Sequence, residues 1–206
     1  MKKRTGLLLL LLAFFAGAAL AHQPVLVGPE LITIEQPEIS RAYYGELNGK
    51  PRRFLIKAPK PFVLYVNLLV PDQANPTGRY SAFVYRLIYN RKILQTALLA
   101  EAADWQRFYE PFGGDYYRRG PAYKQSVPAG GYEIEVYNRD NRGKYVLVVG
   151  EAEFWGPREI LNVYWLVPKL KVDYFNSNLL SFLITPFGLV LVVIAGLVIR
   201  AVLQRW

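Results

Sequence analysis

The sequence predicts a mainly β fold: an antiparallel β-sandwich of the jelly-roll or immunoglobulin-like kind, followed by a juxtamembrane helix and one C-terminal transmembrane helix. Short β-branched and aromatic segments recur from Leu31 to Gly150, with Gly- and Pro-containing turns between them. No long amphipathic pattern of period 3.6 interrupts these segments. An uncharged apolar stretch near the C-terminus is long enough to cross a bilayer as a helix.

The N-terminal segment has the pattern of a secretory signal peptide. Three cations at positions 2–4 precede an uncharged run that ends in Ala19-Leu20-Ala21, a small-x-small cleavage site. We therefore expect residues 1–21 to be a signal peptide and His22 to begin the mature chain. The alternative for the two apolar ends, a pair of core helices in a soluble protein, is disfavoured by the cations directly ahead of the first run.

The charge pattern argues against a nucleic-acid-binding role. The formal net charge is +9, from 25 Lys and Arg against 16 Asp and Glu, but these charges are interspersed without a basic block. This pattern predicts an ordinary solvated surface, with a mild attraction to anionic lipid headgroups as the alternative. The chain has no cysteine, so burial alone must hold an exported domain together, and thiol chemistry is excluded.

The strand signals predict that residues 22–153 form the sandwich domain. Tyr80–Tyr89 and Lys92–Leu99 are expected to form a hairpin, although residues 93–103 also fit a helix. The last two segments are expected to form a second pair, joined by Asn138–Gly143. The predicted strands are Leu31–Ile34, Arg41–Glu46, Arg53–Lys57, Pro61–Val70, Tyr80–Tyr89, Lys92–Leu99, Tyr132–Tyr137 and Lys144–Gly150.

The character of the sequence changes at Phe154. Pro157, with an acid two residues later, suits a helix start, and Ile160–Val167 is expected to form a short apolar helix that Pro168 ends. Its aromatic residues suit the headgroup region of a membrane, so residues 154–178 are predicted to be a juxtamembrane segment. A further buried strand is the alternative.

Residues 179–202 are predicted to be a transmembrane helix, because no charge lies between Asp173 and Arg200. The basic end of the signal segment stays inside whether or not the segment is cleaved. We therefore expect a single-pass protein of a prokaryotic cell membrane, in contact with the lipid bilayer. Its N-terminal domain would lie outside, and the tail 203–206 would lie in the cytoplasm.

Two glycines in the predicted transmembrane helix suggest a second role for it. Gly188 and Gly196 are eight residues apart, about two turns, and so fall roughly on one face. Small residues permit close helix contact in lipid. These two glycines are predicted to face another transmembrane helix, and a plain anchor is the alternative.

The stretch from Glu110 to Tyr123 is the most distinctive part of the predicted domain. Gly113-Gly114 permits a tight backbone conformation, and aromatic residues beside charged ones suit a ligand-binding face. In the alternative, the rings alternate into the core while the arginines are solvated. The residues predicted to bind a ligand are Trp105, Tyr116, Tyr117, Arg118, Arg119 and Tyr123.

His22 is a candidate copper ligand, because it is the one histidine of the chain and the expected first mature residue. An α-amine and an imidazole are nitrogen ligands that copper(II) favours. No second histidine is present, so a carboxylate such as Asp72, Asp104 or Asp115 would have to complete the site. An incidental N-terminal residue, with no metal or other cofactor, is the alternative.

No enzyme is expected. The serines lack a nearby histidine, and the sequence contains no nucleophile elbow, P-loop or HExxH motif. We expect a non-catalytic binding or scaffolding module for an envelope or membrane protein. Copper binding at His22 and surface-glycan binding are the alternatives, and the latter requires exposed coplanar rings between Tyr116 and Tyr123.

Two neighbouring segments, Val127–Tyr137 and Gly143–Val148, carry a family resemblance. They resemble the end of a pre-peptidase C-terminal-type domain, in which Pro-Ala-Gly-x-Tyr opens an alternating strand and Gly-x-Tyr opens the last one. The resemblance implies a small secreted β-sandwich that serves as a non-catalytic accessory module. This chain departs from the pattern because it carries its own anchor. The whole arrangement also resembles exported single-pass membrane proteins of prokaryotes, a likeness that implies no function.

Overall fold

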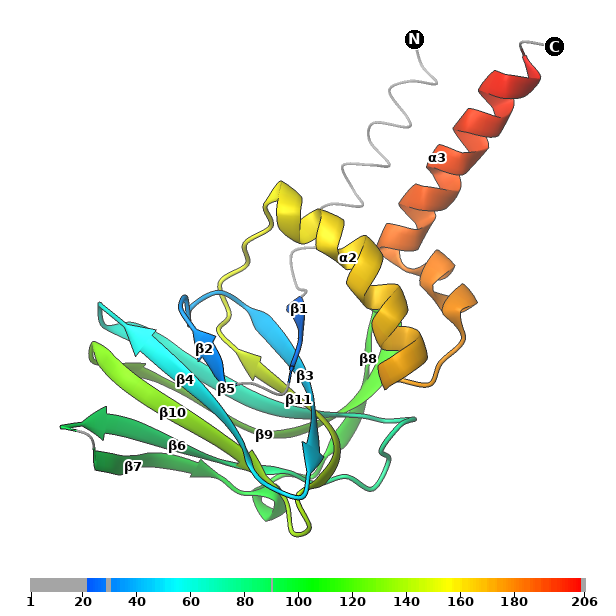
Figure 1. Ribbon diagram of the computed structural model, residues 1–206. Coiled ribbons are helices and arrows are strands. Elements are labelled where there is room, and N and C mark those ends of the chain that lie inside the picture. Colours follow the sequence, from blue (N-terminus) through cyan, green and yellow to red (C-terminus); the bar gives the residue numbers. More distant parts are fainter. Residues whose placement is uncertain (1–21, 29–30, 90, 205–206) are drawn as a thin grey trace.

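The computed structural model describes residues 22–28, 31–89 and 91–204. The predicted signal peptide, residues 1–21, and the end of the predicted tail, Arg205 and Trp206, lie outside the described residues. The described chain forms two stacked β-sheets with helical segments at one end (Figure 1). The predicted mainly β sandwich with an apolar C-terminal helix is confirmed.

Each strand belongs to one of two sheets, and strands that are neighbours in a sheet are mostly not consecutive in the chain. Sheet A runs β1 (Gln23–Leu26), β3 (Arg41–Asn48), β11 (Arg142–Val149), β5 (Phe62–Pro71), β9 (Asp115–Val127), β8 (Gln106–Glu110). Sheet B runs β2 (Ile32–Ile34), β4 (Arg52–Ala58), β10 (Gly130–Tyr137), β6 (Ser81–Ile88), β7 (Arg91–Leu98). The pairs β1–β3 and β2–β4 are parallel, so both sheets are mixed at their N-terminal edges, whereas the other named pairs are antiparallel.

The hairpin of β6 and β7 is confirmed, and residues 91–98 are a strand rather than the alternative helix. The second predicted pair is wrong, because β10 and β11 belong to different sheets. Val136 of β10 pairs with Ala82, and Val146 of β11 pairs with Leu69. The polar loop between β10 and β11 instead crosses from sheet B to sheet A. A short loop reverses the chain direction in a hairpin and in such a crossing alike, so the turn residues do not distinguish the two connections.

The main core lies between the sheets and is built from the inward side of each strand. Alternation along a strand sends every second side chain to this core. Three of its largest members, Tyr80, Tyr132 and Tyr145, are fully buried. A core of this size suits a domain that has no disulfide to support it.

A second apolar layer covers the outer face of sheet A. The helix α2 (Pro157–Lys169) continues into a π-helical turn, η3 (Leu170–Tyr174). The predicted helix is therefore confirmed, but Pro168 lies inside it and does not end it. A proline lacks a backbone donor, and the widened π turn directly after it lets the chain continue. Leu170 and Phe175 pack on Tyr44 and its neighbours in sheet A.

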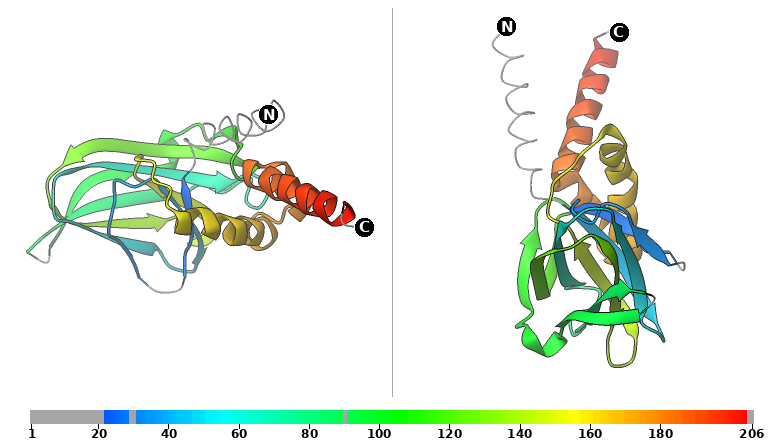
Figure 2. Two further views of the ribbon diagram at one scale, coloured as in Figure 1. Left: turned by 90° about the horizontal axis from the view of Figure 1, so that it is seen from above. Right: turned by 90° about the vertical axis from the view of Figure 1, so that its left-hand side faces the viewer.

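The predicted transmembrane segment is divided into two pieces. A short 3₁₀ helix, η4 (Leu179–Ile184), precedes α3 (Pro186–Leu203), which leads away from the sandwich (Figure 2). The prediction of one helix over residues 179–202 is therefore wrong at its start. The reason is local, because Thr185 caps α3 and Pro186 occupies its first turn. The 18 residues of α3 have a mean hydropathy of 2.5, and by length and composition they are able to span a membrane.

Candidate functional site

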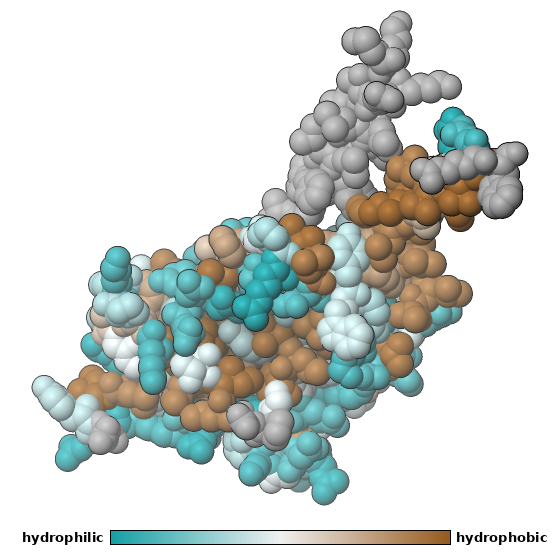
Figure 3. Space-filling view, turned by 45° about the horizontal axis from the view of Figure 1, so that its top comes forward, coloured by the Kyte–Doolittle hydropathy of each residue, from teal (hydrophilic) through white to brown (hydrophobic). Residues whose placement is uncertain are grey.

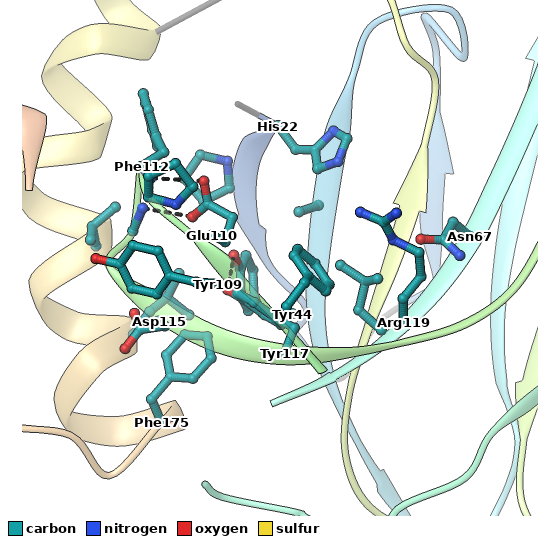
Figure 4. A pocket seen from close by; sticks show the side chains of 18 of the residues that line it. His22, Tyr44, Asn67, Tyr109, Glu110, Phe112, Asp115, Tyr117, Arg119 and Phe175 are labelled. Carbon is teal, nitrogen blue, oxygen red and sulfur yellow. Dashed lines mark hydrogen bonds between the residues drawn. The ribbon is translucent and has the colours of Figure 1, made fainter. Parts of the chain in front are cut away.

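A cleft of about 300 Å³ lies between the outer face of sheet A and the α2–η3 segment. Strands β1, β3, β5, β8 and β9 supply its sheet side, and Val167, Leu170 and Phe175 close it from the helical side. His22, Arg119 and Asn67 lie toward one end, and Glu110, Phe112 and Asp115 lie toward the other (Figure 4). The cleft thus has an end with nitrogen-bearing side chains, an acidic end and an aromatic middle.

Aromatic side chains form the middle of the cleft. The hydroxyls of Tyr44 and Tyr117 are hydrogen-bonded at 2.9 Å, and burial raises the pKa of both groups, so they remain neutral. Phe175 packs edge-on against Tyr117, with ring centroids 5.4 Å apart, and Phe108 stacks on Tyr117 at 5.8 Å. Such rings offer an apolar surface with a few polar points, which is the usual composition of a ligand site.

The acidic end is built by the turn between β8 and β9. The Glu110 carboxylate accepts hydrogen bonds from the backbone N–H groups of Phe112 at 2.8 Å and Gly113 at 2.6 Å. Burial nevertheless raises the pKa of Glu110 above its usual range. Gly114 has a φ of +71°, which explains why this turn needs a glycine.

A buried ion pair joins the acidic end to the helical layer. The Nζ atom of Lys171 lies 2.9 Å from Oδ2 of Asp115 and 3.4 Å from the carbonyl oxygen of Gly114. The Lys171 side chain is 0% exposed, and that of Asp115 is 9% exposed. Burial raises the pKa of Asp115, and the neighbouring ammonium opposes that rise. The pair therefore fastens η3 to the start of β9.

His22 and Arg119 form the opposite end. The Nδ1 atom of His22 is hydrogen-bonded to Oγ of Ser40 at 2.5 Å. Burial lowers the pKa of His22, Arg119 lowers it further, and Glu151 raises it. The Arg119 guanidinium lies 4.6 Å from the centroid of the Phe108 ring, and no carboxylate among the described residues is within ion-pair distance of it.

Because His22 is the one histidine of the chain, its pKa reports on the charges at this end of the cleft. We expect Arg119→Gln to raise the pKa of His22, because the substitution removes a nearby positive charge. Glu151→Gln should lower it, because that variant removes a negative charge. Arg91→Gln, an equal charge change on strand β7, should leave it unchanged. An NMR titration of the imidazole signal in untagged protein measures all three. Equal shifts from Arg119→Gln and Arg91→Gln would contradict the arrangement.

The structure separates the residues that the sequence predicts to bind a ligand. Tyr117 and Arg119 line the cleft. Trp105 instead lies in the core between the sheets, where its Nε1–H donates to the carbonyl of Ala100 at 2.8 Å. Tyr123 packs partly buried against the same core. Trp105 and Tyr123 therefore do not line the cleft; as in the alternative, their rings turn into the core.

Tyr116 and Arg118 do not line the cleft. Arg118 and Arg107 each place Nε 2.6 Å from a carboxylate oxygen of Asp72. The Arg107 guanidinium also covers the Tyr116 ring at 3.7 Å, and the rings of Tyr116 and Tyr109 are inclined by 53°. The strand alternation explains the split, because Tyr116 and Arg118 lie one residue out of phase with Tyr117 and Arg119.

No group of three His, Cys, Asp or Glu side chains is placed to hold a metal ion within the part of the chain that the structure describes. Two of the carboxylates considered as partners for His22 are engaged elsewhere, Asp72 with two arginines and Asp115 with Lys171. The imidazole of His22 faces the positive charge of Arg119. These surroundings do not favour copper binding.

The two glycines of α3 have different surroundings. Gly188 is buried, and a Cβ atom there would lie 1.9 Å from the carbonyl oxygen of Phe182, so the chain's own η4 packs on it. A Cβ atom at Gly196 would meet nothing within 4 Å. Contact with another transmembrane helix stays a prediction, and Gly196 is the position with room for it.

Comparisons with known proteins add little. No family model and no curated protein matches the chain. Among solved structures, the pre-peptidase C-terminal domain of a collagenase from Bacillus anthracis has a TM-score of 0.38 and 11% identity, covering 60% of this chain and 96% of that one. A β-glucosidase from Paenibacillus barengoltzii has a TM-score of 0.28 and 9% identity, covering 63% and 13%. At these values the likenesses carry no argument about function.

Proposed function

We propose that the protein is a membrane-anchored, extracytoplasmic, non-catalytic binding module of a prokaryotic cell, and that its ligand occupies the cleft described above. In this proposal α3 crosses the cell membrane, with the sandwich outside and the C-terminus in the cytoplasm. An accessory role of the pre-peptidase C-terminal kind is part of the proposal and rests on the sequence resemblance at residues 127–148. The observation that carries the proposal is the cleft itself, which has an aromatic middle and a cation, Arg119, that no carboxylate of the described residues pairs with.

The chemistry of the cleft supports an anionic ligand with an apolar part. Arg119 offers charge-assisted hydrogen bonds to a carboxylate or phosphate, and a guanidinium is well suited to such groups. The rings beside it offer contact to an apolar moiety, and a volume of about 300 Å³ fits a small molecule or one terminal side chain. The source is either a free small carboxylate or the C-terminal residue of an envelope or membrane protein.

Two other functions are less well supported. Glycan binding requires exposed coplanar rings, whereas the exposed rings of Tyr116 and Tyr109 are inclined by 53° and the Arg107 guanidinium lies over the Tyr116 ring. Copper binding requires further ligands near His22, and Asp72 and Asp115 are engaged with cations.

The proposal predicts saturable binding of phenylbutyrate, a probe with a ring, a chain and a carboxylate. The full chain in lipid nanodiscs is titrated while the NMR signal of His22 is followed. We expect a saturable shift with the acid and little with its neutral amide, because Arg119 contacts the charge. Arg119→Gln should abolish the shift, and Arg91→Gln should keep it.

A second arm distinguishes the two sources of the ligand. A short peptide that ends in phenylalanine with a free carboxylate is compared with the same peptide amidated at its end. Tighter binding of the free peptide than of phenylbutyrate favours a protein partner. An unsaturable drift, equal for acid and amide and present in Arg119→Gln, would overturn the proposal.

A further inference from the structure

Two short surfaces beside α3 are strongly apolar and yet exposed. On η4, Leu180 is 67% exposed and Ile184 is 72% exposed. On α2, Leu161 is 69% exposed and Trp165 is 75% exposed. We call these four residues the apical surface. In Figure 3 hydrophobic side chains cover α3 and continue onto the segments next to it. Exposed apolar groups of this size require an explanation in an exported protein.

The apical surface is joined to α3 by tight packing. The hydroxyl of Thr185 donates to the carbonyl of Phe182 at 2.6 Å and accepts from the N–H of Gly188 at 3.3 Å. Since a Cβ atom at Gly188 has no space, η4 lies directly against the first turn of α3. The elbow between the two helices is thus part of the fold, and η4 cannot move far from the start of the apolar helix.

The helix α2 belongs to the same unit. Its inner residues Val163 and Val167 share one buried cluster with Phe182 of η4, Phe187 of α3 and Phe112 of the β8–β9 turn. The rings of Phe112 and Phe187 are 4.5 Å apart and edge-on. This cluster holds α2, η4 and α3 together on the sandwich. Because Leu161 and Trp165 are four residues apart, they lie on one face of α2, away from the cluster.

The length of α3 also points to a bilayer beside η4. Its 18 residues extend about 27 Å as an α-helix, slightly less than the ~30 Å of a hydrocarbon core. The segment directly before the helix would therefore be at the membrane boundary. Two exposed cations on α2, Arg158 and Lys169, suit contact with anionic headgroups, and Trp165 is of the type enriched at that depth.

We propose that the apical surface lies in the headgroup region of the bilayer, so that the protein docks on the membrane by η4 and α2 in addition to crossing it by α3. The inference rests on the proposed membrane anchoring by α3. Lipid is the occupant because the surface is continuous with the helix that is apolar enough to span a membrane. The docked unit fixes the orientation of the sandwich, because α3 is packed onto the domain rather than joined by a free linker.

The absence of cysteine makes a direct depth measurement possible. Spin labels are attached to the full chain in vesicles of phosphatidylcholine and phosphatidylglycerol, through Leu161→Cys, Leu180→Cys, Leu94→Cys or Ile194→Cys, one at a time. Leu94 is the matched control, an exposed leucine on β7 at 54% exposure, and Ile194 reports on α3. Collisions with oxygen, which concentrates in lipid, are compared with collisions with a water-soluble nickel chelate.

The expected result is that the ratio of oxygen to chelate collisions at Leu161 and Leu180 lies between the high ratio at Ile194 and the low ratio at Leu94. If Ile194 lies in lipid but Leu161 and Leu180 behave like Leu94, the apical surface faces water and the inference is overturned. Spin–spin broadening at Leu161 or Leu180 would mean that a second copy covers the surface, which also overturns it. A water-exposed Ile194 would refute the membrane anchor itself.

Discussion

Lys171→Ala should destabilise the folded chain by about 3–5 kcal/mol, the cost of breaking a buried ion pair from one side. The ammonium of Lys171 is fully buried and lies 2.9 Å from Oδ2 of Asp115. Its removal leaves the carboxylate buried without its cation and frees η3 from the start of β9. Denaturant unfolding of the full chain in nanodiscs, followed by circular dichroism of the β-sheet, measures the change.

Two further variants test whether the buried pair is the cause. Lys169→Ala removes a neighbouring lysine whose pair with Asp173 is exposed, and it should cost no more than about 0.5 kcal/mol. The double variant Lys171→Met with Asp115→Leu should recover most of the loss, because it replaces the pair by apolar side chains. Equal losses from Lys171→Ala and Lys169→Ala would show that the buried pair does not hold the layers together.

The second large effect concerns the C-terminal boundary of the folded unit. A fragment of residues 22–153 should aggregate, whereas a fragment of residues 22–178 should be soluble and rich in β-structure. The shorter fragment lacks α2 and η3. It therefore also lacks Tyr174, whose hydroxyl donates to the carbonyl of Gly45 at 2.7 Å in the complete fold. Truncation at 153 exposes a contiguous set of apolar side chains on sheet A: Ala42, Tyr44, Leu69, Tyr117, Val146 and Val148.

Size-exclusion chromatography and circular dichroism compare the two fragments at equal concentration. The sequence places a domain boundary after residue 153, and that boundary stays a prediction until this comparison is made. A soluble, cooperatively unfolding 22–153 fragment would show that the sandwich is complete without its helical layer. In that case the helical wall of the cleft would be a separate, removable element.

Most strands are predictable from the sequence because their signal is local, but β1, β8 and β9 are not among the predicted strands. Alternation and turn residues mark Arg53–Lys57 and Pro61–Val70, and these segments are strands in the fold. The partner of a strand is not local information, and this is why the sequence pattern pairs β10 with β11 although they lie in different sheets. Thr185 followed by Pro186 is a helix-start pattern and marks the start of α3. The apolar composition continues across this point, however, and therefore favours one helix over the whole of residues 179–202.

The site was predictable only in part for the same reason. The composition around Tyr117 and Arg119 indicates a ligand-binding stretch, yet it shows neither that this stretch is a strand nor which face of the strand borders a cleft. Lys171 and Asp115, which form the buried ion pair, are 56 positions apart in the sequence. From the sequence alone, Lys171 resembles the other charged residues that flank the apolar C-terminal segment. A single lysine between apolar neighbours, Leu170 and Val172, was the available signal that it is buried.

If the cleft between sheet A and η3 is a ligand site, a bound probe must lie in it. Intermolecular NOE contacts between phenylbutyrate and the full chain in deuterated nanodiscs report which side chains lie next to it. We expect contacts from the phenyl ring to Phe108, Tyr117 and Phe175, with the carboxylate end near His22. Contacts confined to α3 and lipid, or to surface rings such as Tyr89, would contradict the claim.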